Sequence, residues 1–226
     1  HVAATGARVE TLELDGDFAA VEVTVPVINE AGQASQFVLD LTVTDASGQI
    51  IQSDSRPYFI TAGEENDFKT ALTLENIQAW TAESPNLYQL NVSLRQGDSL
   101  LDQDQQSFGI RTLSVDSKRG FRVNGQVVNL RGACIHHDSG LLGAATYQTA
   151  QRRQVRLLKE AGFNAIRMAH HPAAPALLRA CDELGLYVMD ETFDMWTHFK
   201  SDFDYSLFFE ENWRKDVTAM VETDCS

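Results

Sequence analysis

Hydrophobic and polar residues alternate along the first half of the chain. Residues 21–27 carry valine at every second position, and the same period returns in 39–43, 72–74 and 88–94. A period of two is that of a β-strand with one buried face. The polar turn sequences NEAGQ, DASGQ and RQGDS fall among these runs. The pattern predicts an antiparallel, immunoglobulin-like β-sandwich over residues 1–110.

The pattern changes in residues 111–226, where short apolar runs alternate with stretches of helical period. The sequence FRVNGQVV predicts a β-hairpin, because Asn-Gly supplies the two positive φ angles of a type I′ turn. Strands that alternate with helices are parallel, so this half is predicted to be an α/β unit. The expected strands are 129–135, 164–168 and 186–190 (the last buried on both faces), and the expected helices are 149–162, 174–185 and 210–224.

Ionisable residues gather at the carboxyl ends of these three strands, the edge where parallel α/β folds bind their ligands. Histidine comes in the doublets 136–137 and 170–171, and the acids come as the pair 190–191. Side chains alternate along an extended chain, so one member of each pair is expected to point inward. An aromatic side chain in a polar loop after a strand suits a platform for a sugar or another ring. The candidate binding residues are His136, Asp138, Arg167, His170, Glu191 and Trp196.

Several of these residues also have a purely structural interpretation. Arg167 is suited to a stabilising ion pair, and Trp196 to a place in the core. The histidines and acids resemble zinc donors, but neither HxH nor HExxH spacing occurs, so no metal and no cofactor is expected. Cys134 and Cys181 lie in apolar runs and are expected to be small buried hydrophobes. GxSxG, the motif of one class of serine hydrolases, is absent.

The net charge of the chain limits which classes of partner it can bind. The chain has 18 basic and 32 acidic residues, for a net charge of −14, which argues against a nucleic-acid partner. It has no apolar run of about 18 residues, so no membrane span is expected. It begins with His1 rather than methionine, which suggests part of a longer protein. The compartment stays open between the bacterial cytoplasm and the periplasm or exterior.

Residues 164–191, NAIRMAHHPAAPALLRACDELGLYVMDE, resemble a signature of glycoside hydrolase family 2, the β-galactosidase and β-glucuronidase family. Two positions depart from it, since Met168 replaces a small residue and His171 replaces a tyrosine. Residues 108–138 are similar to the family's linker into its barrel, and DETFDMW at 190–196 is similar to one β-galactosidase branch. The matching positions are Asn164, Arg167, His170, Pro172, Leu177, Leu178, Asp182 and Gly185.

The resemblance implies an immunoglobulin-like domain followed by the first three βα units of a (β/α)8 TIM barrel. It also implies retaining hydrolysis by two glutamates, both expected beyond residue 226, so the chain alone is predicted to be inactive. His136 and His170 would contact sugar hydroxyls, and Arg167 would lie beside the nucleophile's carboxylate. The magnesium positions of another branch of the family fall on Met195 and Thr197, which does not support that metal.

These expectations leave three functional interpretations. The first is part of a retaining β-glycosidase, most similar to a β-galactosidase, whose partner is a β-linked oligosaccharide or galactoside. The second is a non-enzymatic carbohydrate-binding or assembly module in which the sandwich is the working part. The third is a metal-dependent hydrolase on another α/β fold. Three βα units leave open sheet edges, so the second half is expected either to be incomplete because of where the chain was cut or to be completed by another copy, as a homo-oligomer.

Overall fold

The computed structural model describes residues 1–224. The described residues form two compact units. One unit holds residues 1–80 and 86–127, and the other holds residues 81–85 and 128–224. Residues 111–127 therefore belong to the same compact unit as the sandwich. The domain boundary that the sequence places after residue 110 stays a prediction.

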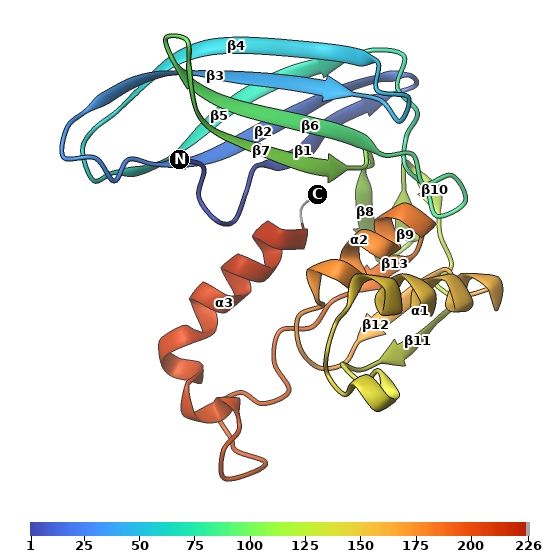
Figure 1. Cartoon of the computed structure of the whole chain (residues 1–226). Coiled ribbons are helices and arrows are strands. Elements are labelled where there is room, and N and C mark those ends of the chain that lie inside the picture. Colours follow the sequence, from blue (N-terminus) through green and yellow to red (C-terminus); the bar gives the residue numbers. More distant parts are fainter. Residues whose placement is uncertain (225–226) are drawn as a thin grey trace. The chain divides into compact units, whose positions relative to one another are not determined.

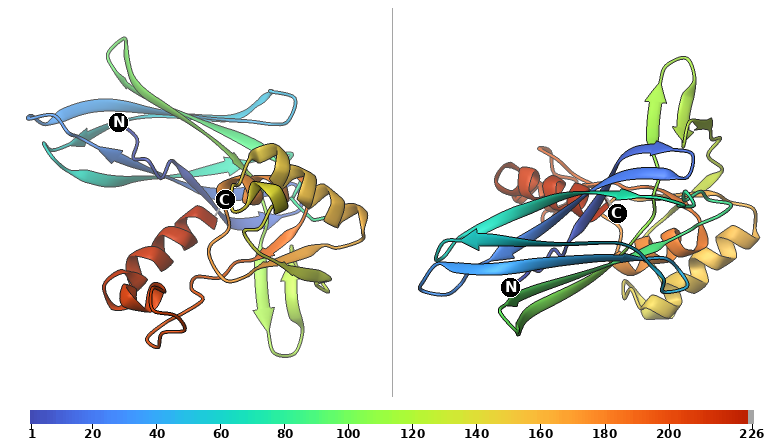
Figure 2. Two further views of the ribbon diagram at one scale, coloured as in Figure 1. Left: turned by 60° about the horizontal axis from the view of Figure 1, so that its bottom comes forward. Right: turned by 90° about the horizontal axis from the view of Figure 1, so that it is seen from above.

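The first unit is a sandwich of two antiparallel sheets (Figures 1 and 2). One sheet has the strand order β1-β2-β5 and the other has the order β4-β3-β6-β7. Seven strands split in this way between two sheets make an immunoglobulin-like arrangement. The strands are β1 (Arg8–Asp15), β2 (Phe18–Ile28), β3 (Ser35–Thr44), β4 (Ile50–Ile60), β5 (Glu65–Leu74), β6 (Tyr88–Gln96) and β7 (Ser99–Phe108).

The alternating positions of the sequence form the sandwich core, as predicted. Val21, Val23 and Val25 of β2 are each 0% exposed, and Leu90 of β6 is too. Full burial of such a side chain contributes about 1.5–3 kcal/mol. The core of this unit is therefore continuous between the two sheets, with each strand contributing one face.

A three-stranded meander completes this unit, with β8 (Leu113–Asp116), β9 (Gly120–Val123) and β10 (Gln126–Val127). Its tight turn is the predicted one, because Asn124 and Gly125 have φ angles of 50° and 75°. The Asn124 side chain accepts a hydrogen bond from the Thr112 N–H (2.9 Å) and donates one to the Trp80 carbonyl (3.0 Å). The turn is thus tied to the end of the sandwich.

The second unit contains a parallel sheet whose strands neighbour one another in chain order. This order extends in one direction, as in a barrel, whereas a doubly wound sheet reverses. The predicted helices and strands are all present, with bounds that differ by a few residues. They are β11 (Gly132–Ile135), the 3₁₀ turn η1 (Gly140–Leu142), α1 (Gln148–Glu160), β12 (Ala165–Met168), α2 (Pro175–Leu184), β13 (Tyr187–Met189), the turn η2 (Tyr205–Leu207) and α3 (Phe209–Asp224).

Helices α1 and α2 cover one face of this sheet. Val155 of α1 and Leu177 of α2 pack with Ile166 and Met168 of β12 in a single buried cluster. The sheet therefore has one apolar face, and its other face is available for polar side chains.

Among the described residues, no helix is both long enough and apolar enough to cross a membrane.

Two sequence predictions about burial are wrong, for the same reason. Cys134 is exposed, and Met189 of β13 is 54% exposed, because both lie on the sheet face that α1 and α2 do not cover. The apolar composition of a strand indicates that it is buried, but not on how many faces. Cys181, on the inner side of α2, is buried as predicted, and burial raises the pKa of its thiol.

A close approach holds the end of α2 against the segment 81–85. Gly185 ends α2 with a left-handed φ of 78°, and an added Cβ would lie 2.1 Å from the Ala82 carbonyl oxygen. The Lys159 ammonium donates to the carbonyls of Ala82 and Gly185, and burial lowers the pKa of Lys159. Only glycine fits this position without displacing the backbone.

Replacing Gly185 with alanine is expected to destabilise the chain by about 3–4 kcal/mol, from left-handed strain of about 1–2 kcal/mol and the clash with the Ala82 carbonyl. Gly162→Ala is the matched control, because Gly162 follows α1 with a φ of 89° and has nothing within 4 Å of an added Cβ. Urea unfolding measures the loss of stability in each variant. Both variants carry the left-handed strain, so the additional loss in Gly185→Ala measures the clash. Equal losses of stability would contradict the close approach.

Candidate functional site

The register of the parallel sheet lines up three side chains on its uncovered face. Arg167 in the central strand pairs with Cys134 of β11 on one side and with Met189 of β13 on the other. Side chains alternate along each strand, so these three point to the face opposite α1 and α2. The sheet thus presents a guanidinium between two sulfur-bearing side chains.

Beyond the carboxyl ends of the strands, four polar side chains meet. The Arg167 Nε and Nη2 atoms lie 2.6 Å and 2.5 Å from Glu191 Oε1. The other carboxylate oxygen, Oε2, lies 3.1 Å from His170 Nδ1. The rings of His136 and His170 meet edge to face, with centroids 5.5 Å apart. We call His136, Arg167, His170 and Glu191 the polar cluster.

The polar cluster is half open to solvent. The side chains of Arg167, His170 and Glu191 are 39%, 40% and 24% exposed. Cys134 Sγ, 3.3 Å from Arg167 Nη1, and the Glu191 carboxylate together raise the pKa of the guanidinium. A fixed cation beside exposed imidazoles can bind a polyhydroxylated or anionic ligand through directed hydrogen bonds.

Asp190 and His171, the other members of two of these pairs, point elsewhere, as the alternation predicts. Asp190 accepts the Ala173 N–H with both carboxylate oxygens, each at 3.0 Å, and also accepts the Glu191 N–H. His171 lines a separate cavity of about 490 Å³ beside α3. His136, His170 and Glu191 are therefore the members that meet.

The structure does not bring the other two candidates into the polar cluster. The Asp138 carboxylate accepts the Gly140 N–H in the turn η1 (3.0 Å), and Asp138 lines a cavity next to α1. Trp196 is 64% exposed on the loop between β13 and α3. Binding roles for Asp138 and Trp196 therefore stay predictions.

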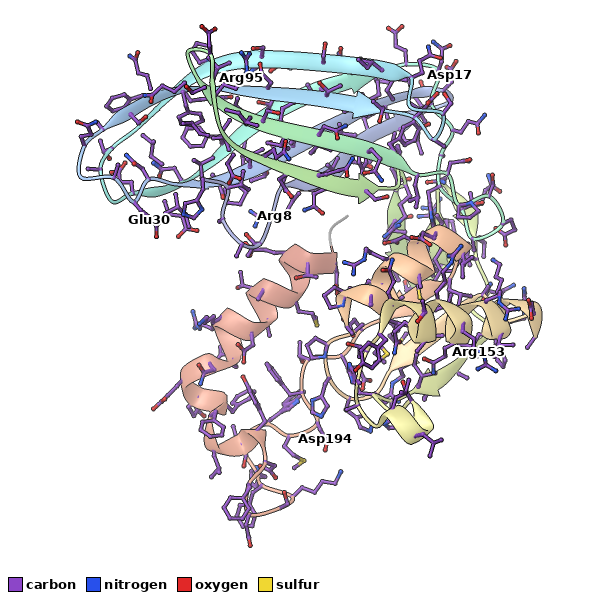
Figure 3. The ribbon with its side chains drawn as sticks, in the orientation of Figure 1. Arg8, Asp17, Glu30, Arg95, Arg153 and Asp194 are labelled. Carbon is purple, nitrogen blue, oxygen red and sulfur yellow. The ribbon has the colours of Figure 1, made fainter. Side chains whose placement is uncertain are left out.

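The loop that carries Trp196 has its own internal order. Asp204 accepts hydrogen bonds from the Ser206 hydroxyl and from the N–H groups of Lys200, Ser201 and Ser206. These bonds, that of the hydroxyl most of all, lower the pKa of its carboxyl group. Phe193 stacks on Tyr205 with ring centroids 4.6 Å apart. Figure 3 labels Asp194 on this loop. The loop begins directly after Glu191, so its first residues leave from the polar cluster.

Two features of the site escaped the sequence analysis. Cys134 is a neighbour of Arg167, and the alternation that places Arg167 and His136 could have indicated it. An ion pair of Arg167 was among the interpretations of the sequence, but its partner Glu191 had no sequence signal, because alternation gives the face of a side chain and not its partner. Over residues 1–224, no group of three or more His, Cys, Asp or Glu side chains is arranged to hold a metal ion.

Two acidic side chains, Asp224 and Asp190, lie in contact near the polar cluster. Asp224, at the end of α3, is half-buried, and burial together with the charge and hydrogen bond of Asp190 raises its pKa to about 7. Two backbone N–H groups, those of Ala173 and Glu191, donate to the Asp190 carboxylate at 3.0 Å.

The raised pKa of Asp224 predicts that stability falls with rising pH. The folded chain holds a proton that the unfolded chain releases near pH 3.9, so this contribution is present at acidic pH and is lost as pH rises through about 7. The stability advantage of Asp224→Asn over the parent is expected to grow by about 1–2 kcal/mol between pH 5 and pH 8.5, a value reduced for partial exposure. Urea unfolding at both pH values tests this, with the exposed Asp202→Asn as control. A gap that does not change with pH would contradict the contact.

Comparison with known families identifies the family to which this fold belongs. The model of the glycosyl hydrolases family 2 matches residues 7–111, and the model of that family's TIM barrel domain matches residues 114–221. The class of protein is that of the glycoside hydrolases, because both matching models describe domains of such enzymes. The chain belongs to glycosyl hydrolases family 2.

The similar proteins within this family carry two different names, beta-galactosidase and beta-glucuronidase. It is 35% identical to the beta-galactosidase BoGH2A of Bacteroides ovatus over 99% of this chain and 26% of that protein. It is 39% identical to a putative beta-glucuronidase of Formosa agariphila over 64% of this chain and 14% of that protein. The chain thus spans about a quarter of BoGH2A.

Solved structures give the same fold. A family 2 glycosyl hydrolase of Bacteroides cellulosilyticus superposes with a TM-score of 0.93 at 35% identity, covering 100% of this chain and 29% of that one. A beta-glucuronidase of Bacteroides uniformis superposes with a TM-score of 0.83 at 28% identity, covering 97% of this chain and 26% of that one. The family acts on β-glycosides, and relatives of both named specificities share the fold of this chain.

Proposed function

We propose that the chain carries part of the sugar-binding wall of a retaining β-glycosidase whose substrates are β-galactosides. The observation that carries the proposal is the meeting of His136, Arg167 and His170 at the carboxyl ends of adjacent parallel strands. The 35% identity to a beta-galactosidase over 99% of the chain supports the choice of galactosides.

The chemistry of the polar cluster suits the recognition of a sugar ring. A neutral imidazole has one nitrogen that accepts and one that donates, so the position of its proton decides whether it accepts from a sugar hydroxyl or donates to it. A site that binds hydroxyls through oriented donors and acceptors discriminates strongly against ligands that lack them. In this proposal, His136 and His170 contact hydroxyls, and Arg167 holds the catalytic nucleophile's carboxylate ionised.

Catalysis requires two carboxyl groups about 5–5.5 Å apart on either side of the glycosidic bond. Glu191 is committed to Arg167 and His170, and Asp190 to backbone N–H groups. We therefore assign both catalytic glutamates to the gene product that continues this chain to its relatives' length, called the extended protein below.

Chromogenic glycosides test the proposed specificity. The extended protein is assayed with the p-nitrophenyl β-galactoside and β-glucuronide, which differ in the oxidation state of carbon 6 and in the configuration at carbon 4 of the sugar. A kcat/KM at least about 100-fold higher for the galactoside is expected, because an unpaired substrate carboxylate is costly in a site built for a hydroxyl. A higher value for the glucuronide would overturn the galactoside assignment and favour the specificity named for several relatives.

The second interpretation, a non-enzymatic sandwich module, is less well supported. A shallow depression of about 330 Å³ on β6 and β7 is lined by Asn91, Val92, Ser93, Gln103, Asp104 and Gln105. This lining holds no aromatic ring, and sugar-binding surfaces usually rely on aromatic platforms. Isothermal titration of the sandwich with galactosides decides between the interpretations, since binding by the sandwich alone favours the module.

A further inference from the structure

Glu191 bridges two residues of the polar cluster with its two carboxylate oxygens. Oε1 lies 2.6 Å from Arg167 Nε and 2.5 Å from Arg167 Nη2, and Oε2 lies 3.1 Å from His170 Nδ1. The side chain is 24% exposed, the least of the three. A carboxylate engaged at both oxygens is poorly placed to bind a sugar directly.

The contact with Glu191 determines which nitrogen of His170 carries the proton. An ionised carboxylate only accepts hydrogen bonds, so His170 Nδ1 has to donate. In the neutral ring, Nε2 is then left without a proton and can only accept. A carboxylate that orients an imidazole in this way is a recurring device of hydrolytic sites.

The same carboxylate fixes the guanidinium of Arg167. The guanidinium has five N–H groups, and three of them are engaged. The N–H on Nε and one on Nη2 face Glu191, and one on Nη1 faces Cys134. Two N–H groups remain on the terminal nitrogens. The Glu191 contact therefore holds the guanidinium in one plane and leaves donors for a further acceptor.

From these contacts we infer that Glu191 is a positioning residue rather than a sugar ligand. It sets the Nδ1–H tautomer of His170, so that Nε2 accepts a hydrogen bond from a substrate hydroxyl. It also sets the orientation of the Arg167 guanidinium. The inference rests on the proposed function for its substrate, but the tautomer of His170 is a property of this chain alone.

Glu191→Gln tests the inference with little change of shape. Arg167 donates toward Oε1, so the glutamine oxygen is expected to face Arg167 and the amide NH₂ to face His170 Nδ1. The amide donates there, which forces Nδ1 to accept and moves the proton to Nε2. The hydrogen-bonding role of Nε2 toward a hydroxyl is thereby reversed.

The first measurement is the imidazole ¹⁵N spectrum of the 226-residue chain near pH 8.5, where histidine is neutral. His170 is identified by comparison with His170→Gln. The parent is expected to show the Nδ1–H form and Glu191→Gln the Nε2–H form. Asp190→Asn, at the neighbouring position, is the control and should keep the parent's tautomer. An unchanged tautomer in a folded Glu191→Gln variant would overturn the inference.

The second measurement is the activity of the extended protein. Glu191→Gln is expected to lower kcat/KM by about 10–100-fold, as the loss of an outer orienting group typically does. With deoxyglycosides, the analogue that lacks the hydroxyl bound by His170 should show a much smaller difference between parent and variant. An equal loss for every deoxyglycoside would contradict the assigned role and indicate a general structural effect.

The two measurements separate this inference from the proposed function. If the tautomer switches but the extended protein hydrolyses no β-glycoside, the proposed function fails and the positioning by Glu191 stands. If the parent hydrolyses β-galactosides and Glu191→Gln is unimpaired, the inference fails alone. Should Glu191→Gln not fold, Glu191→Ala with added formate replaces it. Recovery of the Nδ1–H form with formate supports the inference, and no recovery contradicts it.

Discussion

The 226-residue chain is expected to release no nitrophenol from any β-glycoside above a protein-free blank, whereas the extended protein turns over. Retaining hydrolysis uses one carboxyl group as acid and base and a second as nucleophile, which together account for most of a glycosidase's rate enhancement. In residues 1–224, the acids of the polar cluster region are already paired, Glu191 with Arg167 and His170 and Asp190 with Ala173.

The comparison needs a folded chain. Near-UV circular dichroism and a cooperative unfolding transition establish that the shorter protein is native before its activity is judged. Both proteins are assayed at equal molar concentration with galactoside, glucuronide and mannoside substrates. Turnover by the 226-residue chain that resists further purification would contradict the assignment of both glutamates to the rest of the extended protein.

Arg167→Met in the extended protein is expected to lower kcat/KM about 1,000-fold, comparable to removal of a key electrostatic group from an active site. The substitution keeps much of the side chain's length but removes the cation that Glu191 contacts at 2.5 Å. It also leaves the Glu191 carboxylate without its main partner, free to disturb His170. Steady-state kinetics with a β-galactoside measures the loss.

Two further variants make this result specific. Arg156→Met removes an exposed arginine of α1, which pairs with Glu160 one turn later, and is expected to leave kcat/KM unchanged. Arg167→Lys keeps the charge but not the planar fork, so it should recover only a small part of the activity. Activity within about threefold of the parent in Arg167→Met would show that the guanidinium has no role in the reaction.

Regular patterns explain what the sequence could predict. The valines of β2 repeat with a period of two, and the apolar stripes of α1 and α2 repeat with a helical period, so each element shows which face it buries. The glycines that end these helices, Gly162 and Gly185, mark their boundaries. From parallel strands it then follows that His136, Arg167 and His170 lie at one edge.

The features that the sequence could not predict depend on contacts between distant residues, which no local pattern encodes. Alternation places Arg167 and Glu191 on one face but does not give their pairing. The contact of Asp224 with Asp190 depends on the path of the 190–208 loop, which has no hydrophobic period. The exposure of Cys134 depends on which sheet face the helices cover, and the apolar strand sequence gives no indication of that.

The most direct test of the account is a crystal structure of the extended protein in which a 2-deoxy-2-fluoro-β-galactoside has trapped the nucleophile. The account predicts that Nε2 of His136 or His170 lies within hydrogen-bonding distance, about 3 Å, of a sugar hydroxyl. It also predicts Arg167 beside the sugar-bearing carboxylate. A trapped sugar whose nearest atoms lie more than about 6 Å from both imidazoles, beyond the reach of a hydrogen bond, would contradict it.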